Sequence, residues 1–445
     1  MALGRRKREQ QDFWVSSCDL PKSPGHPFYS KLNQLFDEAG FDTFVESLCK
    51  PYYAERRGRP GIPPGVYFRM LFIGYMEGLS SQRAIAWRCS DSRSLQSFLG
   101  YAITDTTPDH SSLTVIRQRL PLDIHEAVFT FVLSIAKMKK LLQGKSVAID
   151  STFIEADAAM KSIVRRDTGD HWKAYLRKLM AEEGIDDPTD EDIRRFDKKR
   201  KKKVSNKEWV SPSDPASRIA RMKDGRTHLA YKTEHAIDLE TDIILAASVY
   251  KADEADTKTL METLVAAEAN TALAGSSTQI KDVVADKGYH STDNVVLCEA
   301  WGVRSYIPER ENRWQRKWSD KPVAHKHATY GNRRRVKGDR GKRLSRLRSE
   351  YVERSFAHVC ETGGARRSWL RGLEDVTKRY LMYVAGKNLG VIMRVLFGMG
   401  KPRTLQTGGG GDSSTIWTGI ATVFGMLRPI GDRWTHRIGW AKIAA

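Results

Sequence analysis

The fold is decided by the segment Ser146-Val147-Ala148-Ile149-Asp150-Ser151-Thr152-Phe153, which is rich in β-branched residues and carries one charge. Such a run predicts a buried strand. In front of it, from about residue 25 to 140, apolar residues recur at helical spacing, so the segment marks the change from a helical region to a sheet. A lone carboxylate in a buried strand is costly unless a cation compensates for it, which makes Asp150 the first candidate functional residue.

Strand and helix patterns alternate after this segment. Strands are predicted over 228–238 and 243–249, joined by a turn at Glu240-Thr241-Asp242, and then over 280–285 and 303–308. Helices are predicted over 256–274, 292–300, 344–358 and 373–397. This order predicts a mixed sheet flanked by helices, an α+β or α/β arrangement preceded by an all-α N-terminal domain.

The N-terminal helical region has capped turns. Apolar residues from Tyr67 to Leu79 recur at helical spacing, and Gly78 marks the end of this first helix. A second short helix follows a serine cap. A third helix follows the turn Thr107-Pro108-Asp109-His110-Ser111-Ser112. The polar side of the third helix is expected to show Arg117 and Arg119. Three short helices of this kind are typical of a helix-turn-helix DNA reader or of a plain helical bundle, and the pattern does not separate the two.

The chain is strongly basic. Its 445 residues include 74 Lys and Arg against 54 Asp and Glu, a formal net charge of +20. More than half of this excess lies between Trp301 and Glu350, where 16 basic residues accompany 5 acidic ones. Lys and Arg displace condensed counterions from nucleic acid, so the charge favours a polyanionic partner. A basic surface that contacts only solvent is the open alternative.

Composition also excludes several classes of protein. The N-terminus is charged but lacks the apolar run of a secretory signal, and the longest low-charge stretch, 414–427, is shorter than the roughly 20 residues of a membrane helix. No C-x-x-C pair occurs, so neither a zinc framework nor a disulfide ladder is indicated for the scattered cysteines Cys18, Cys49, Cys89, Cys298 and Cys360. We expect a cytoplasmic protein with reduced thiols and no membrane segment.

Two further acids stand out by position. Asp286 lies where a strand passes into Gly288 and a helix, at the edge where open α/β sheets place their sites. Glu353 lies on a helix after the basic stretch. If the strands before Asp150 and Asp286 are neighbours, the two aspartates come together, and a packed helix could add Glu353. Asp286 could also be only a helix cap, and Glu353 could form a surface ion pair with Arg354.

Converging carboxylates repel one another, and hard divalent cations are the usual remedy. Mg²⁺ prefers carboxylate oxygen and leaves positions for water and substrate phosphate. Two such ions activate the attacking oxygen and stabilise the leaving oxygen in phosphodiester displacement. An acidic pocket with basic walls is therefore suited to cutting DNA.

Three segments carry a family resemblance: Ala148-Ile149-Asp150-Ser151-Thr152, Ala285-Asp286-Lys287-Gly288-Tyr289 and Val352-Glu353-Arg354-Ser355-Phe356. They resemble the three acidic motifs of bacterial insertion-sequence DDE transposases. The run Glu361 to Arg367, with Arg371-Gly372 and Asn388-Leu389-Gly390, is similar to the end of that catalytic domain. Residues Pro63 to Leu120 are similar to the helical domain in front of it, so the likeness covers about 25–395.

The resemblance implies an RNase H-like fold in which Asp150, Asp286 and Glu353 bind two Mg²⁺ ions, with Mn²⁺ able to substitute. The implied reaction is hydrolysis at transposon ends followed by attack of the freed 3′-hydroxyl on target DNA. The implied partners are the terminal inverted repeats, target DNA and a second copy of the chain, because two ends must be held together. Candidate DNA contacts are Arg117, Lys287, Tyr289, Arg333, Arg334, Arg335, Lys337, Arg354, Arg366, Arg367 and the basic run 198–203, while His290 or His358 could assist near the metals.

These observations predict four regions. They are a basic N-terminal tail (1–24), a helical DNA-binding domain (25–140), an RNase H-like catalytic domain (141–400), and a Gly-rich linker with a C-terminal tail (401–445). The catalytic domain contains a charged insertion at 156–225, expected to be partly helical around Trp172 to Glu183, and a basic segment at 309–345 without a core pattern.

One departure from the family pattern limits the comparison. Some relatives carry Tyr and Arg seven and four residues before the glutamate and Lys seven residues after it, whereas this chain has Arg346, Ser349 and Cys360 there. A hairpin intermediate is therefore not implied. Two alternatives stay open: an inactive, domesticated or decayed transposase that only binds DNA, and a structure-specific nuclease that cleaves without joining.

Overall fold

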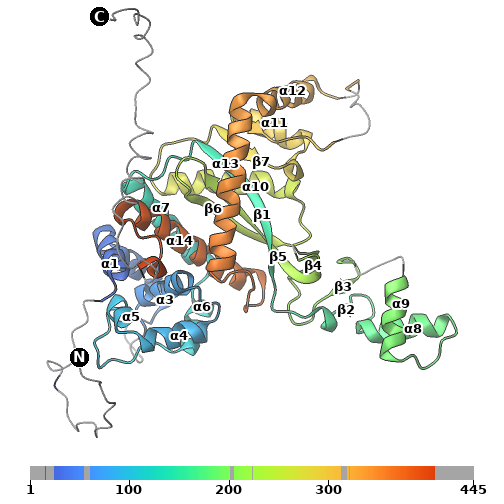
Figure 1. Cartoon of the computed structure of the whole chain (residues 1–445), viewed down its shortest axis with the longest axis horizontal. Helices are drawn as coiled ribbons and strands as arrows, with labels where there is room; N and C mark the ends of the chain where they lie inside the picture. The colour runs from blue at the N-terminus through green and yellow to red at the C-terminus, as the bar shows by residue number, and fades with distance from the viewer. Residues whose placement is uncertain are drawn as a thin grey trace, which may run out of the picture.

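The computed structural model describes residues 16, 25–54, 61–200, 205–222, 224–311, 318–319 and 321–405. Outside these residues lie nearly all of the predicted N-terminal tail, Lys201 to Lys203 of the basic run, and residues 406–445 of the predicted Gly-rich linker and C-terminal tail. The described chain begins with helices around one apolar core (Figure 1): α1 (Pro27–Ala39), α2 (Phe41–Cys49), α3 (Pro64–Glu77), α4 (Gln82–Asp91), α5 (Arg93–Phe98), α6 (His110–Arg119) and α7 (Leu122–Met138).

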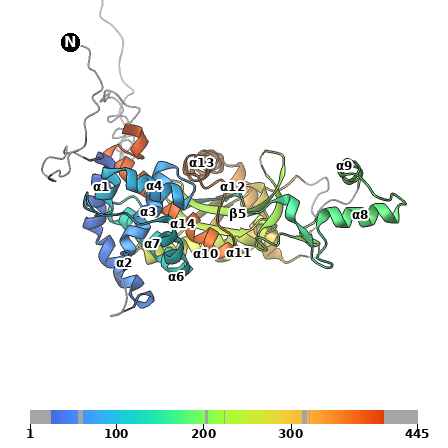
Figure 2. The same ribbon diagram turned by 90° about the horizontal axis from the view of Figure 1, so that it is seen from below.

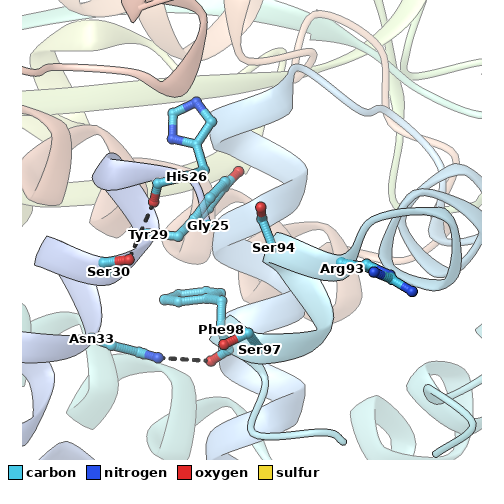
Figure 3. Close-up of a pocket in the computed structure, with 9 residues that line it drawn as sticks. All are labelled: Gly25, His26, Tyr29, Ser30, Asn33, Arg93, Ser94, Ser97 and Phe98. Carbon is cyan, nitrogen blue, oxygen red and sulfur yellow. Dashed lines mark hydrogen bonds between the residues drawn. The ribbon is translucent and has the colours of Figure 1, made fainter. Parts of the chain in front are cut away.

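The predicted helix boundaries in this region follow their capping residues. Gly78 ends α3 in the left-handed conformation, with φ +69°. Ser81 caps α4 by accepting a hydrogen bond from the Ala84 amide, and Asp109 caps α6 through the Ser111 amide. Helices α1 and α5 enclose a small cavity of about 150 Å³, beside which the Asn33 side chain donates to the carbonyl of Phe98 (Figure 3).

The predicted mixed sheet is confirmed. Its strands run in the order β4-β5-β1-β7-β8, and β6 also pairs with β5. Strand β1 is antiparallel to β5 and parallel to β7, and β7 is parallel to β8. The strands of this sheet are β1 (Ser146–Glu155), β4 (Arg218–Arg221), β5 (Thr227–Asp238), β6 (Ile244–Lys251), β7 (Asp282–Ala285) and β8 (Arg304–Tyr306).

Helices cover both faces of the sheet (Figures 1 and 2). Helix α10 (Asp256–Leu273) packs on one face, and the long helix α13 (Asp339–Phe356) crosses the other, over β1, β5 and β7. Helices α11 (Thr292–Ala300) and α12 (Val323–Lys337) lie beside β8. Short helices occur at η1 (Lys50–Tyr52), η2 (Met160–Ser162), η3 (Lys287–Tyr289) and η5 (Pro402–Leu405), and a π-helical turn, η4 (Ala357–Thr362), continues α13.

Helix α14 (Leu373–Phe397) joins the two halves of the core. It contacts α3 and α7 of the helical region and β6 of the sheet. Its length and composition would allow it to cross a membrane, but 78% of its most apolar window is buried inside the protein. The burial shows that α14 is the central helix of a folded core, at the bounds expected from its apolar pattern.

Two segments differ from the sequence-based expectation. The basic stretch 309–345 was expected to lack a core pattern, yet it forms α12 and the start of α13. The inward residues of α12 are small or polar, namely Ala328, Thr329 and Asn332, so no large apolar stripe marks the helix. The Asn332 amide bonds the backbone amide and carbonyl of Ile307, which fixes α12 to the sheet.

The charged insertion after β1 contains more structure than expected. It forms a projecting helical arm of α8 (Trp172–Glu182) and α9 (Asp190–Lys199), seen at the right of Figure 1. The arm has its own apolar cluster of Leu176, Met180 and Ile193, and a two-stranded ribbon of β2 (Val164–Arg165) and β3 (Trp209–Val210) lies at its base. The helix α9 was missed because charged residues outnumber its few apolar ones.

Candidate active site

The sheet brings Asp150 and Asp286 to the same place. In the parallel pairing of β1 with β7, Ile149 lies opposite Ala285. The next residue of each strand is therefore one of the two aspartates, and the expectation that these strands are neighbours is confirmed. Both carboxylates therefore lie at the same end of two adjacent strands, where their like charges repel.

Burial and hydrogen-bond donors act on the pKa of the Asp150 carboxyl in opposite directions. Burial is the largest influence and raises its pKa, and the charges of Asp286 and Asp256 add to this effect. Two contacts act against burial: Arg348 Nη1 lies 2.6 Å from Asp150 Oδ2, and the Ser151 amide donates to Oδ1 at 2.8 Å. The carboxylate therefore stands in a crowded anionic environment in which a positive charge is stabilising.

Asp286 is oriented by the turn that follows it. Its Oδ1 accepts a hydrogen bond of 2.7 Å from the Gly288 amide, so Asp286 caps η3 while remaining half-buried beside β1. A Cβ added at Gly288 would lie 2.8 Å from Asp286 Oδ1 and 2.9 Å from Asp256 Oδ2, closer than real side chains come. The glycine is therefore required by the close approach of two carboxylates and not by backbone conformation.

Asp256 is a third acid beside Asp150 and Asp286, and the sequence interpretation missed it. Its Oδ1 accepts hydrogen bonds of 3.2 Å from Ser151 Oγ and from Lys232 Nζ. Lys232 is only 2% exposed, so its ammonium is buried, while the Asp256 side chain is 33% exposed. A sequence clue existed, because Lys232 lies inside a predicted strand and alternation places it on one face with Glu234.

A buried polar network lies beneath these carboxylates on the α10 face. Glu234 Oε1 accepts hydrogen bonds from Tyr289 Oη at 2.6 Å and Thr259 Oγ1 at 2.9 Å, and Thr263 donates to its other oxygen. Burial raises the pKa of the Glu234 carboxyl and holds that of Tyr289 well above its usual value. Tyr289 is fully buried, which argues against the expected direct contact with DNA.

Glu353 does not join the two aspartates in this structure. It is exposed on α13, five residues beyond Arg348, which at about 100° per residue places the two side chains on different sides of the helix. Within the described part of the chain, no three His, Cys, Asp or Glu side chains are grouped so that they could hold a metal ion. The sheet therefore assembles the aspartate pair, and the expected third acid lies outside it.

The donor chemistry at the aspartate pair fits a hard divalent cation. Asp150 and Asp286 offer carboxylate oxygens, the ligands that Mg²⁺ prefers, while the neighbouring Asp256 pairs with Lys232, and Arg348 contacts Asp150. Three acids against two cations leave the cluster anionic. No sulfur or imidazole ligand is among these contacts, so a softer metal is not favoured.

The predicted DNA contacts fall into three groups. Lys287, Arg334, Lys337 and Arg367 are exposed. Four others are engaged within the protein: Arg333 pairs with Glu309, Arg335 bonds Ser305, Arg354 pairs with Asp242, and Arg366 pairs with Glu361. The last group is Arg117, which was expected on an exposed helix face but is only 7% exposed and pairs with Asp375.

The two histidines named near the site are also packed. His290 is buried, and His358 is half-buried on the π-helical turn after α13. Burial lowers the pKa of His358 to about 4, and the nearby charges of Arg394, Lys401 and Lys387 act in the same direction. His358 is therefore a neutral side chain near pH 7.

Comparison with known families agrees with this geometry. Residues 143–385 match the family described as "Transposase DDE domain", and residues 18–119 match "Transposase domain (DUF772)". The first match alone covers more than half of the chain. No curated protein and no solved structure matches. The helical region followed by a mixed sheet with flanking helices is consistent with the RNase H-like fold, and the chain belongs to the DDE transposase family.

Proposed function

We propose that this chain is an active DNA transposase that cleaves the ends of an insertion sequence and joins the freed 3′-hydroxyl to target DNA. The observation that carries the proposal is the parallel pairing of β1 with β7, which sets Asp150 and Asp286 side by side below α13. A binding protein without chemistry would gain nothing from two half-buried acids held close together, since their repulsion is costly.

In this proposal the site residues have distinct roles. Asp150, Asp286 and Glu353 hold two Mg²⁺ ions, and for Glu353 the support is the resemblance of its motif. Bound divalent ions supply activation of the attacking oxygen and stabilisation of the leaving oxygen. Arg348 contacts Asp150 and can neutralise charge there, while the Gly288 amide and the Asp256–Lys232 pair keep Asp286 and Ser151 in position.

The exposed cations supply the DNA surface. Arg334 and Lys337 in the last turn of α12, with Lys287 and Arg367 near the sheet, are suited to contact phosphates, which positions DNA without reading its sequence. We further propose that residues 25–140 form the domain that binds terminal repeats, that residues 141–400 form the catalytic domain, and that two copies act together in the cytoplasm, associated with the nucleoid.

The test is a cleavage and joining assay with labelled DNA carrying the ends of the element and Mg²⁺ or Mn²⁺. We expect cleavage and strand joining by the wild-type chain and loss of both in Asp286→Asn, which keeps the size of the side chain. The matched control is Asp293→Asn, because Asp293 is an exposed acid in the first turn of α11 and is not the carboxylate that Ser151, Lys232 or Arg348 contacts.

A second measurement separates metal binding from activity. Calorimetric titration with Mn²⁺ should show binding to the wild-type chain and to Asp293→Asn, and weaker binding to Asp286→Asn. DNA binding without cleavage by the wild-type chain would support the inactive DNA-binding alternative. Cleavage without joining would support the nuclease alternative.

A further inference from the structure

A cavity of about 380 Å³ lies between the helical region and the catalytic domain, away from the aspartate pair. Its walls come from α3, α4 and α6 on one side and from α14 with the loop before it on the other, and α3 and α14 also lie together in Figure 1. The volume falls in the range of about 300–1,000 Å³ that is common for ligand sites. The apolar part of the wall consists of Tyr67, Leu71, Ile85, Trp369, Leu370 and Tyr383.

One buried donor in the wall lacks a partner. The Arg117 side chain lines the cavity and is about nine-tenths buried, and its Nε pairs with Asp375 Oδ2 at 3.2 Å. Its Nη1 is buried and has no hydrogen-bond partner within the described part of the chain. A buried donor left unpaired is unfavourable, so Arg117 is prepared for an acceptor that enters the cavity.

The cavity is cationic. Arg83 and Arg379 also line it, and no Asp or Glu is among the lining residues. The guanidinium of Arg379 is fixed by the carbonyls of Arg367, Ser80 and Gly364 and lies over the Tyr383 ring at 4.9 Å. Its charge therefore stands in the wall without a carboxylate partner among the residues that the structure describes, which favours an anionic occupant.

The half-exposed Trp369 offers a stacking surface at this cavity. The Arg367 guanidinium lies over its ring at 4.5 Å, and 48% of the tryptophan is exposed. The loop that carries Trp369 is tied to the catalytic strand β1, because the Glu155 amide donates to the Arg366 carbonyl and the Ser368 amide donates to the Glu155 carbonyl. Occupation of the cavity is thereby connected to the strand that bears Asp150.

We propose that this cavity binds one unstacked nucleotide of the DNA substrate. The base lies among the apolar side chains and against Trp369, and one of its ring nitrogens or carbonyl oxygens accepts the hydrogen bond from Arg117 Nη1. Arg83 and Arg379 attract the attached phosphate. Base–aromatic stacking and Arg contacts tolerate any sequence, so the site binds single-stranded or frayed DNA in preference to intact duplex. The proposal rests on the proposed function only in naming DNA as the partner.

Single-strand binding tests this site without any cleavage step. Fluorescence anisotropy with a labelled 15-nucleotide oligo-dT, at a salt concentration that suppresses duplex binding, is measured for the full-length chain. We expect Trp369→Ala to weaken binding at least about tenfold, the lower end of the loss when a stacking aromatic is removed. Trp301→Ala is the matched control, because Trp301 is also 48% exposed but does not line the cavity, and its affinity should change less than twofold.

Two further readouts make the result specific. Leu71→Phe narrows the cavity while keeping Trp369, and it should weaken oligo-dT binding as well. An oligo-dT carrying one 5-iodouracil should crosslink on irradiation to the peptides that contain Trp369 or Tyr67. Equal affinities of Trp369→Ala and Trp301→Ala, or crosslinks confined to other peptides, would overturn the nucleotide site. Neither outcome depends on cleavage, so failure of the proposed transposase reaction is scored separately by the Asp286→Asn assay.

Discussion

At the scale of single residues, the site depends on Gly288. A methyl group there would meet both Asp286 Oδ1 and Asp256 Oδ2 at under 3.0 Å. Asp286 Oδ1 is held by the Gly288 amide, and the Asp256 carboxylate is held through its other oxygen by Ser151 and Lys232. We expect Gly288→Ala to displace Asp286 and to reduce cleavage at least about a hundredfold, as small displacements of catalytic groups do. The measurement is the rate of cleavage of end DNA under single-turnover conditions.

Gly338→Ala is the control for this change. Its added Cβ would lie 3.5 Å and 3.6 Å from the carbonyls of Arg334 and Arg335, which is ordinary van der Waals contact. The control should keep near wild-type cleavage, and both variants should keep the wild-type circular dichroism spectrum. Wild-type activity in Gly288→Ala would show that Asp286 does not need its present position.

His125 makes stability depend on pH. It is fully buried, with Nε2 3.1 Å from Tyr67 Oη and Nδ1 3.1 Å from the Pro121 carbonyl, and burial lowers its pKa to about 4. Because the pKa of His125 is lower in the folded chain, the unfolded chain takes up the proton at a higher pH than the folded chain does. The contribution of the neutral His125 to the free energy of unfolding is therefore complete above about pH 6.5 and is lost as pH falls towards 4. At pH 5 the loss from His125 is about 2 kcal/mol.

The variant His125→Gln should lack this pH-dependent contribution to stability. Thermal unfolding of the wild-type chain and the variant is followed at pH 7 and pH 5, and the free energy lost between the two pH values is compared. We expect the variant to lose about 2 kcal/mol less than the wild type, because glutamine does not titrate. Equal losses would mean that other groups, such as the buried His235, account for the acid sensitivity.

At the scale of secondary structure elements, the turn between β5 and β6 is tied to two helices by one carboxylate. Asp242 sits in the left-handed region at φ +64°, and its Oδ1 lies 3.0 Å from the buried Lys387 Nζ of α14. Arg354 of α13 lies 3.3 Å from the other oxygen. Burial lowers the pKa of Lys387, and Asp242 counteracts it.

Removing the carboxylate should therefore cost more than removing the ammonium. We expect Asp242→Asn to lower the free energy of unfolding by about 3–5 kcal/mol, because it leaves Lys387 buried without a counter-charge. Lys387→Met should cost less, since Asp242 keeps Arg354. Denaturant titration compares them, with Asp187→Asn as the control for an exposed aspartate at φ +51°. An equal loss of unfolding free energy in Asp242→Asn and Lys387→Met would contradict the prediction that removing the carboxylate costs more than removing the ammonium.

The elements that were predicted correctly are those whose pattern is local. The strand over 146–153, the hairpin turn at Asp242 and the helices at 256–274 and 373–397 carry apolar periodicity or turn residues that act over a few positions. Helix α12 was not predicted, because its buried face consists of the small or polar residues Ala328, Thr329 and Asn332. Asp256 escaped because its partners Ser151 and Lys232 come from distant strands.

At the scale of the whole molecule, the position of Glu353, the expected third acid, could not be predicted from the sequence. The order of the elements predicted that the strands before Asp150 and Asp286 are neighbours, and the parallel register of β1 and β7 confirms it. The rotation of α13 about its axis is set by packing of Val352, Ser355 and Phe356 on the sheet, and this packing leaves Glu353 exposed. The assignment of Glu353 as a metal ligand stays a prediction.

The distribution of charge over the molecule predicts how DNA binding responds to salt. Each phosphate neutralised by Lys or Arg contributes about 0.9 to the slope of log affinity against log salt concentration, because counterions are released. Arg334 and Lys337 are exposed in the last turn of α12, whereas the Lys139 ammonium lies 2.7 Å from Glu38 in the helical region. The first two should therefore contact phosphates, and Lys139 should not.

We expect the double variant Arg334→Gln, Lys337→Gln to lower that slope by about 2, and Lys139→Gln to change it by less than about 0.5. The measurement is anisotropy of duplex DNA at several salt concentrations with each protein. Because this term is independent of sequence, the loss should be the same for end DNA and for unrelated duplex of equal length. An unchanged slope in the double variant would place the duplex on another basic surface, with the helical arm of α8 and α9 as the next to test.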